Sequence, residues 1–163
     1  MDLGLLAARL VLGPLMAAHG SQKLFGWFGG YGLSGTAGFF EQLGFRPGRL
    51  FAGAAALAEI LGGLLVTAGM LGPIGPALIL SVMIVAAVSV HWQHGVFATT
   101  NGIEVPLLYA SGAAALALTG FGRFSVDYAL GYTAWPPAAV AVALSAGALG
   151  AIANLGVRKA VAV

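Results

Sequence analysis

Long apolar runs, nearly free of charge, dominate this sequence and decide the solvent in which it can fold. Only 7% of its 163 residues are charged, whereas 60% are hydrophobic. Ordinary soluble domains carry roughly 25% charged residues, so this chain could not cover its own surface in water. A helix crosses a bilayer with about 20 apolar residues. We therefore expect an integral membrane protein whose helices face lipid.

Glycine, proline and charged residues divide the chain into five predicted spans within one transmembrane domain, 1–163. The predicted fold class is all-α: a polytopic membrane bundle with a four-helix core and a fifth transmembrane helix at the C-terminus. The predicted spans cover residues 3–22, 50–71, 74–92, 105–119 and 136–155.

The segment 24–49, between the first two spans, is predicted to lie at the membrane interface. Glycines make its first part loop-like, and its aromatic side chains are typical of the headgroup region. A short helix is predicted over 37–43, with Gly44 ending it. Because this helix is too short to span, we expect the segment at the interface or dipping into the bundle.

Lysines and arginines in the connections predict the orientation of the bundle. On one predicted side of the membrane, Arg123 is the only lysine or arginine in the connections. The other side should be cytoplasmic, which puts the N-terminus outside and the C-terminus inside, as in a multi-pass protein of the plasma membrane. That richer side collects Lys23, Arg46, Arg49, Arg158 and Lys159.

Several classes of function are excluded by what the sequence lacks. The chain has no cysteine, which excludes disulfides, thiolate metal sites and CxxC redox relays within it. Its net charge is only +2 and it has no long basic run, so we expect no nucleic-acid partner. No nucleophile–base triad, phosphate-binding loop or nucleotide fingerprint is recognisable.

Arg9 and Glu59 are charged residues inside predicted spans, where a charge costs about 2.5 kcal/mol or more. Small residues surround Glu59 along its helix, and they let helices approach closely. We infer an Arg9–Glu59 pair in the bundle interior. Two roles stay open for it: an ion pair that fixes the helix register, or a site that binds a polar headgroup such as a quinone carbonyl or relays a proton.

Histidines near the ends of the spans are further candidates. His19 lies one turn before Lys23, and it either faces water at the interface or donates a hydrogen bond to a ligand. The trio His91, His94 and Glu104 could in principle bind a metal. An interfacial histidine–tryptophan belt is the better interpretation, and we expect no metal.

Arg123 and Asp127, four residues apart, lie between the fourth and fifth spans. We expect them to bracket a turn and to form at most a solvated salt bridge, which contributes little to stability.

A family resemblance covers residues 5 to 127. The sequence carries HGSQKLFGWFGG at 19–30, GTAGFFE at 35–41, AEILGG at 58–63, VHW at 90–92, EVPL at 104–107 and GFGRFSVD at 120–127. In this order and combination the stretches resemble the DoxX family of small bacterial membrane proteins. The fifth span departs from the usual four-helix pattern of that family and would be an added element for packing or partner contact.

The resemblance implies a membrane protein associated with redox systems, in the bacterial inner membrane. The family is named after a subunit of an archaeal thiosulfate:quinone oxidoreductase, whose own family is a relative. Some actinobacterial members are linked to membrane redox complexes and to defence against oxidative stress. The polar residues that match the family pattern are His19, Lys23, Glu59, His91, Glu104, Arg123 and Asp127.

Three functions follow as hypotheses, and whether the chain is an enzyme stays open. The first is a redox-associated membrane subunit that binds a quinone or a similar lipid-soluble ligand, with electrons supplied by a bound cofactor or a partner. The second is a non-catalytic anchor that recruits a soluble oxidoreductase. The third, a small-solute or lipid transporter, is weakened because no internal repeat is evident.

Membrane lipids are expected partners, and a homo-oligomer is left open. The predicted ligand-binding residues are Arg9, His19, Lys23, Glu59, His91, Trp92, Glu104, Arg123 and Asp127.

Overall fold

The computed structural model describes residues 1–158, and this part of the chain consists of helices and their connections, without a strand. The all-α prediction is confirmed. The long helices are α1 (Asp2–Phe25), α3 (Gly48–Ala68), α4 (Ile74–Ala86), α5 (Glu104–Thr119) and α7 (Pro137–Gly156). The short ones are η1 (Trp27–Gly29), α2 (Gly32–Gln42), η2 (Ala87–His91), η3 (Trp92–His94), η4 (Ala98–Thr100) and α6 (Val126–Ala129).

Four helical stretches are long and apolar enough to cross a membrane. They are α1, α3, α7 and the continuous stretch Ile74–His94, in which η2 and η3 extend α4. α5 has 16 residues, which at ~1.5 Å per residue gives about 24 Å, less than the ~30 Å of the hydrocarbon core. The ends of all five helices lie close to those of the predicted spans.

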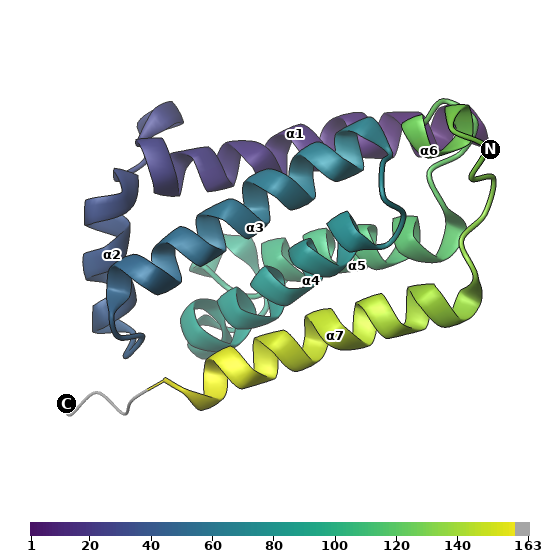
Figure 1. Cartoon of the computed structure of the whole chain (residues 1–163). Helices are drawn as coiled ribbons and strands as arrows, with labels where there is room; N and C mark the ends of the chain where they lie inside the picture. The colour runs from purple at the N-terminus through teal and green to yellow at the C-terminus, as the bar shows by residue number, and fades with distance from the viewer. Residues whose placement is uncertain (159–163) are drawn as a thin grey trace.

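The long helices form an up-and-down bundle (Figure 1). α1 and α3 run antiparallel side by side, α4 and α5 lie beneath them, and α7 packs against α4. α2 crosses one end of the bundle, where α1 ends and α3 begins, and packs against both helices. The N-terminus and α6 lie at the opposite end, which we call the α6 end, as distinct from the α2 end.

The lysines and arginines of the connections are divided between these two ends as the sequence predicts. Lys23, Arg46 and Arg158 belong to segments at the α2 end, whereas Arg123 belongs to the connection at the α6 end. Lys159 lies outside the described residues. Which end faces the cytoplasm stays a prediction.

The interfacial segment is more helical than its sequence indicates. α2 begins at Gly32 rather than at residue 37 and is 11 residues long. Its glycines favour helix poorly, but Thr36 and Ala37 are buried, so packing on the neighbouring helices stabilises the additional turn. Gly44 ends α2 as predicted: it has a φ of 92°, and its N–H bonds the Glu41 carbonyl at 3.0 Å.

α1 and α3 pack in direct backbone contact, which glycine makes possible. A Cβ atom added at Gly13 would lie 2.7 Å from the Gly63 carbonyl oxygen, and one at Gly20 would lie 2.5 Å from that of Ala56. In lipid, helices associate through such close van der Waals packing rather than through the hydrophobic effect. This contact therefore fixes the register of the two helices.

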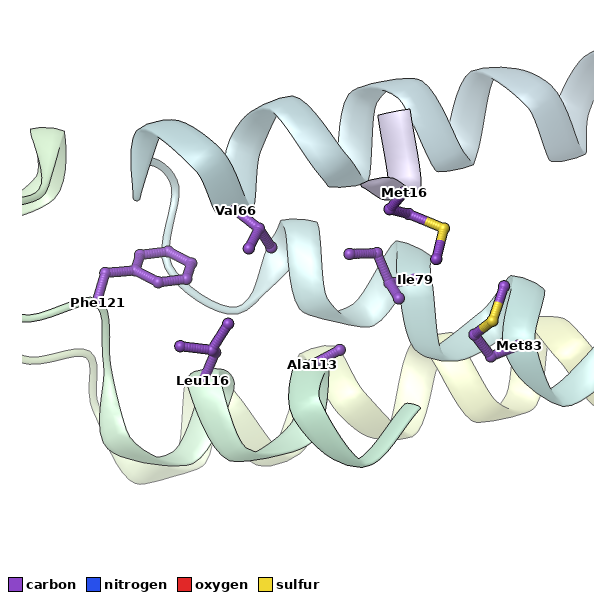
Figure 2. Packing of buried hydrophobic residues seen from close by; sticks show 7 residues of the cluster. All are labelled: Met16, Val66, Ile79, Met83, Ala113, Leu116 and Phe121. Atoms are coloured by element: carbon purple, nitrogen blue, oxygen red, sulfur yellow. The ribbon is translucent and has the colours of Figure 1, made fainter. Parts of the chain in front are cut away.

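A cluster of buried apolar side chains fills the space beneath this helix pair (Figure 2). It joins α1, α3, α4 and α5 with the connection that follows α5. Its members are Met16, Val66, Ile79, Met83, Ala113, Leu116 and Phe121.

A glycine substitution tests the α1–α3 contact. In Gly63→Ala, the new methyl group would lie 2.5 Å from the backbone of Ala17 and of Gly13, so the helices must separate. We expect a loss of about 1–3 kcal/mol, the usual cost of overpacking, measured by denaturation in detergent. Gly53→Ala is the matched control on α3, because its methyl group would meet only Leu33 Cδ1, at 3.9 Å. A Gly63→Ala protein as stable as the control would contradict this account.

Candidate functional site

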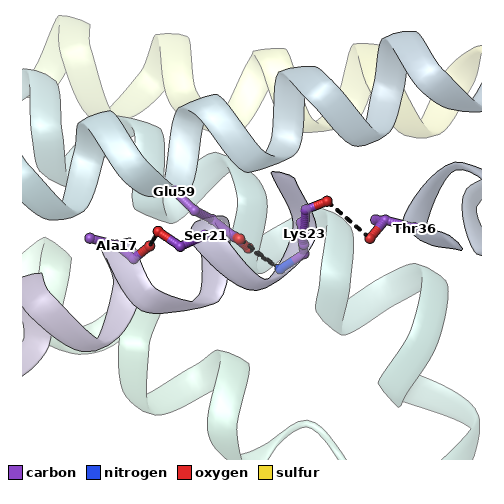
Figure 3. Close-up of polar contacts among 5 residues, drawn as sticks. All are labelled: Ala17, Ser21, Lys23, Thr36 and Glu59. Atoms are coloured by element: carbon purple, nitrogen blue, oxygen red, sulfur yellow. Dashed lines mark hydrogen bonds and ion pairs between the residues drawn. The ribbon is translucent and has the colours of Figure 1, made fainter. Parts of the chain in front are cut away.

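A buried ion pair joins α1 to α3 near the α2 end of the bundle (Figure 3). Lys23 Nζ donates to both carboxylate oxygens of Glu59, at 2.8 Å to Oε1 and 2.6 Å to Oε2. The Glu59 side chain is 2% exposed and that of Lys23 is 28% exposed. The predicted Arg9–Glu59 pair is therefore wrong, since Lys23 is the partner of Glu59.

Helix geometry explains why these two residues meet. Side chains on a helix tilt toward its N-terminus, so Lys23, near the C-terminal end of α1, reaches back into the bundle. Glu59 lies in the middle of α3, which runs the opposite way, and tilts toward the α2 end. The two side chains thus close the distance between residues at different depths.

α2 fixes the end of α1 beside this ion pair. Thr36 Oγ1, buried in α2, donates to the Lys23 carbonyl oxygen at 3.3 Å, one of the helix-end carbonyls that lack a partner within α1 (Figure 3). Two residues before Lys23, Ser21 Oγ donates to the Ala17 carbonyl oxygen within α1, at 2.8 Å. The end of α1 that carries Lys23 is therefore held by α2.

A cavity of about 360 Å³ lies against the ion pair, among α2, α3, α4 and α7. Sites for small organic ligands are typically ~300–1,000 Å³ and mostly apolar, with a few polar groups. This cavity has that character, because alanine, valine and aromatic side chains form most of its wall. Its polar lining residues are Lys23, Glu59, Ser81, Ser89, His91 and Asn154.

His91 reaches this cavity from a π-helical turn. Residues Ala87–His91 continue α4 with the wider π spacing, and Ser89 Oγ within that turn donates to the Val85 carbonyl oxygen at 2.6 Å. Such turns inside α-helices are frequent at functional sites. His91 Nδ1 lies 2.7 Å from the Asn101 carbonyl oxygen. A carbonyl can only accept, so Nδ1 carries the hydrogen, and the Nε2 of a neutral imidazole is an acceptor.

Arg9 is buried at the other end of the α1–α3 pair and bonds only backbone carbonyls. Its Nε and Nη2 donate to Val66 and Thr67 at 3.1 and 2.8 Å, and Nη1 donates to Phe121 and Phe124 at 3.0 and 2.8 Å. Val66 and Thr67 belong to the last turn of α3, where a cation is favourable. These four bonds fasten α1 to α3 and to the connection after α5.

Gly69, which follows α3, makes room for the Arg9 guanidinium. A Cβ atom at this position would lie 2.7 Å from Arg9 Cζ, and the residue has a φ of 65°, which favours glycine. No other residue type would fit here without moving the guanidinium.

Asp127 organises the turn between α3 and α4. Its Oδ1 accepts from the Leu71 N–H at 2.9 Å, and its Oδ2 accepts from the Gly72 N–H at 2.7 Å and from Trp135 Nε1 at 2.9 Å. The expected Arg123–Asp127 salt bridge is absent from residues 1–158, where the ion pair present is Lys23–Glu59. The Arg123 side chain is exposed, and its backbone N–H donates to Asp2 Oδ1 at 3.0 Å.

Three other predicted site residues lie away from the cavity wall. His19 packs edge-on against Tyr109 of α5, with ring centroids 5.7 Å apart. Trp92 is 70% exposed. Glu104 accepts from the Ala98 N–H at 2.7 Å through Oε2 and closes the loop before α5. His91, His94 and Glu104 do not gather into a group that could hold a metal within residues 1–158.

The structure thus brings Lys23, Glu59 and His91 to one cavity, whereas ligand binding by any predicted residue stays a prediction. The other residues of the wall were not among the predicted ligand-binding residues. Its aromatic part is a row of mutually tilted rings, in which the centroid of Phe45 lies 5.7 Å from that of Phe40 and 5.5 Å from that of Phe51. The FF pair within the family-like stretch 35–41 was the only signal that could have indicated it.

A substitution of Arg9 tests its structural role. Arg9→Met removes four hydrogen bonds and leaves buried carbonyls without partners, at ~1–3 kcal/mol for each group that stays dry. We expect a loss of roughly 2–4 kcal/mol, measured by denaturation in detergent. Arg123→Met is the control, because that side chain is exposed. Equal stability of the two variants would show that the carbonyls find other partners.

Comparison with known proteins identifies the family. A family model described as DoxX matches residues 4–92, which is more than half of the chain and includes Arg9, Lys23, Glu59 and His91. No curated protein and no solved structure matches the sequence. The matched region extends from α1 to the end of the π-helical turn, and the resemblance read from the sequence is confirmed. The chain belongs to the DoxX family of membrane proteins.

Proposed function

We propose that this protein binds a quinone, or a ligand of the same chemistry, in the cavity against the Lys23–Glu59 pair. The observation that carries the proposal is a buried ion pair on the wall of an otherwise mostly apolar cavity. Ionisable residues inside a membrane are costly and usually mark a functional site. An ion pair needed only to join two helices would not require open space beside it.

The polar groups of the cavity suit both forms of a quinone. The Lys23 ammonium has three N–H donors and gives two of them to Glu59. Its third can donate to a quinone carbonyl. Glu59 and His91 Nε2 are acceptors, and either can receive a hydrogen bond from a quinol hydroxyl. The reduced and the oxidised ligand would thus each find a complementary group.

The apolar wall suits the remainder of such a ligand. Phe39, Phe40, Phe45 and Phe51 provide aromatic surface for a planar ring. Ala54, on the same wall, is exposed on α3. In this proposal a lipid-soluble carrier enters the cavity beside Ala54 from the bilayer.

In this proposal the chain is the lipid-phase subunit of a redox system in the plasma membrane. Electrons would pass to or from a bound cofactor or a partner redox protein, because the sequence has no cysteine for a dithiol relay. The protein's own residues would hold the ligand and exchange protons with it.

Narrowing the cavity tests the proposal without removing a charge. Ala58 lines the cavity and is half-buried, so Ala58→Phe should fill part of the volume that the ligand needs. Leu61→Phe is the control on the same helix, because Leu61 is 51% exposed and does not line the cavity. We expect saturable binding of decylubiquinone to the wild type and a loss of about tenfold or more in affinity for Ala58→Phe, measured by calorimetry in detergent. Equal affinity in both variants would refute the proposed cavity.

Extraction from native membranes separates this proposal from the anchor hypothesis. The protein would be purified in mild detergent, and its co-purifying lipids and proteins identified by mass spectrometry. Quinone at a ratio near one to one supports the binding site. A stable soluble oxidoreductase with no bound quinone supports the anchor and refutes the proposal.

A further inference from the structure

A second hollow lies on the other side of Lys23, among the end of α1, η1 and α2. This cleft has a volume of about 600 Å³. Like the first cavity, the cleft has a mostly apolar wall, but glycines form part of it and several uncharged polar side chains reach it. The polar ones are Gln22, Tyr31, Thr36 and Gln42.

Lys23, Phe39 and Phe40 line both hollows, and Lys23 is the only charged residue that does so within residues 1–158. Its ammonium is bound to Glu59, which lines only the first cavity. The buried carboxylate is thus separated from the cleft by one lysine side chain. Other titratable groups around Glu59 are Tyr109 of α5, which packs on His19, and His91 across the cavity.

The partial exposure of Lys23 requires a polar neighbour. An ammonium that faced hydrocarbon would be strongly unfavourable, and charged groups within membranes face water-filled cavities or one another. The Lys23 side chain is 28% exposed, and it lines both hollows. Water held by the polar side chains of the cleft satisfies this requirement, and the cleft volume of about 600 Å³ far exceeds the ~30 Å³ of one liquid water molecule.

The position of the cleft gives it access to the aqueous phase. α1 has 24 residues, about 36 Å at ~1.5 Å per residue, which is longer than the ~30 Å hydrocarbon core. Its C-terminal end, with Lys23, therefore reaches toward the headgroups. The cleft lies at this end of the bundle, and Tyr31 on its wall is 87% exposed.

We propose that the cleft between α1 and α2 is a water-filled vestibule through which Glu59 exchanges protons with the solution at the α2 end. Lys23 stands at its inner end and faces both hollows. The functional meaning of this route rests on the proposed quinone site, because quinone and quinol differ by two protons that need a path to water. The route itself is a property of the chain without ligand.

The test follows the Glu59 carboxyl group directly. In Lys23→Met the buried carboxylate loses its cation and takes up a proton, which gives a carboxylic C=O band in the infrared spectrum. The band is assigned by its loss in Lys23→Met/Glu59→Gln. Its shift after transfer to D₂O reports exchange with water. If Lys23→Met fails to accumulate, Lys23→Gln, also uncharged, takes its place.

A plug attached after folding shows which path the protons take. The chain has no cysteine, and a Cβ atom at Gly38, on the cleft wall, meets nothing within 4 Å. In Lys23→Met/Gly38→Cys a bulky thiol reagent therefore fills the cleft of a folded protein, and the unlabelled sample is its control. Leu61→Cys, labelled in the same background, controls for label on the lipid-facing surface.

We expect rapid exchange without label, a slowing of about tenfold or more with label at Gly38→Cys, and no change with label at Leu61→Cys. A band that does not shift in D₂O, or one that shifts equally fast with the cleft filled, would overturn the vestibule. No quinone is present in this experiment. Its failure is therefore distinguishable from failure of the quinone proposal.

Discussion

Inside a bilayer a charged side chain must find its partners within the protein, and this constraint organises the α1–α3 pair. Arg9 meets it at one end of the pair by donating to four backbone carbonyls. Lys23 and Glu59 meet it at the other end by pairing with each other. Between them, glycines bring the two helices into backbone contact. Polar bonds at the ends and close packing in the middle thus specify the same register, and the cavity, the cleft and the turn to α4 are built around it.

Four of the five predicted spans correspond to helices long and apolar enough to cross a membrane, and they could be predicted because the thickness of the bilayer sets the length of such a helix. The buried charges were identified for the same reason, since a charge in an apolar run is costly. The pairing could not be predicted. Every residue has a backbone carbonyl, so nothing in the sequence marks Val66 or Phe124 as a partner of Arg9. Lys23 had been counted among the positive charges at one side of the membrane, but its long side chain reaches back to Glu59.

The candidate site was only partly visible in the sequence, because it is made by elements far apart along the chain. Lys23, Glu59 and His91 come from α1, α3 and the π-helical turn, and Asn154 comes from α7. A π-helical turn has no reliable sequence signal, so the orientation of His91 toward the cavity was not foreseeable. Asp127 shows the opposite case: it is a conspicuous charge near the interface, yet its carboxylate shapes a turn 55 residues away, at Gly72.

The end of α7 has a consequence for how the protein is made. Arg158 Nε donates to the Leu43 carbonyl oxygen, and the guanidinium lies over the Phe45 ring, 6.0 Å from its centroid. One turn earlier, Asn154 closes the cavity wall. The ribosome synthesises α7 after the other helices described in residues 1–158, so the cavity stays open on this side until α7 is inserted. A large lipid-soluble molecule can therefore enter during biogenesis, before the last wall is in place.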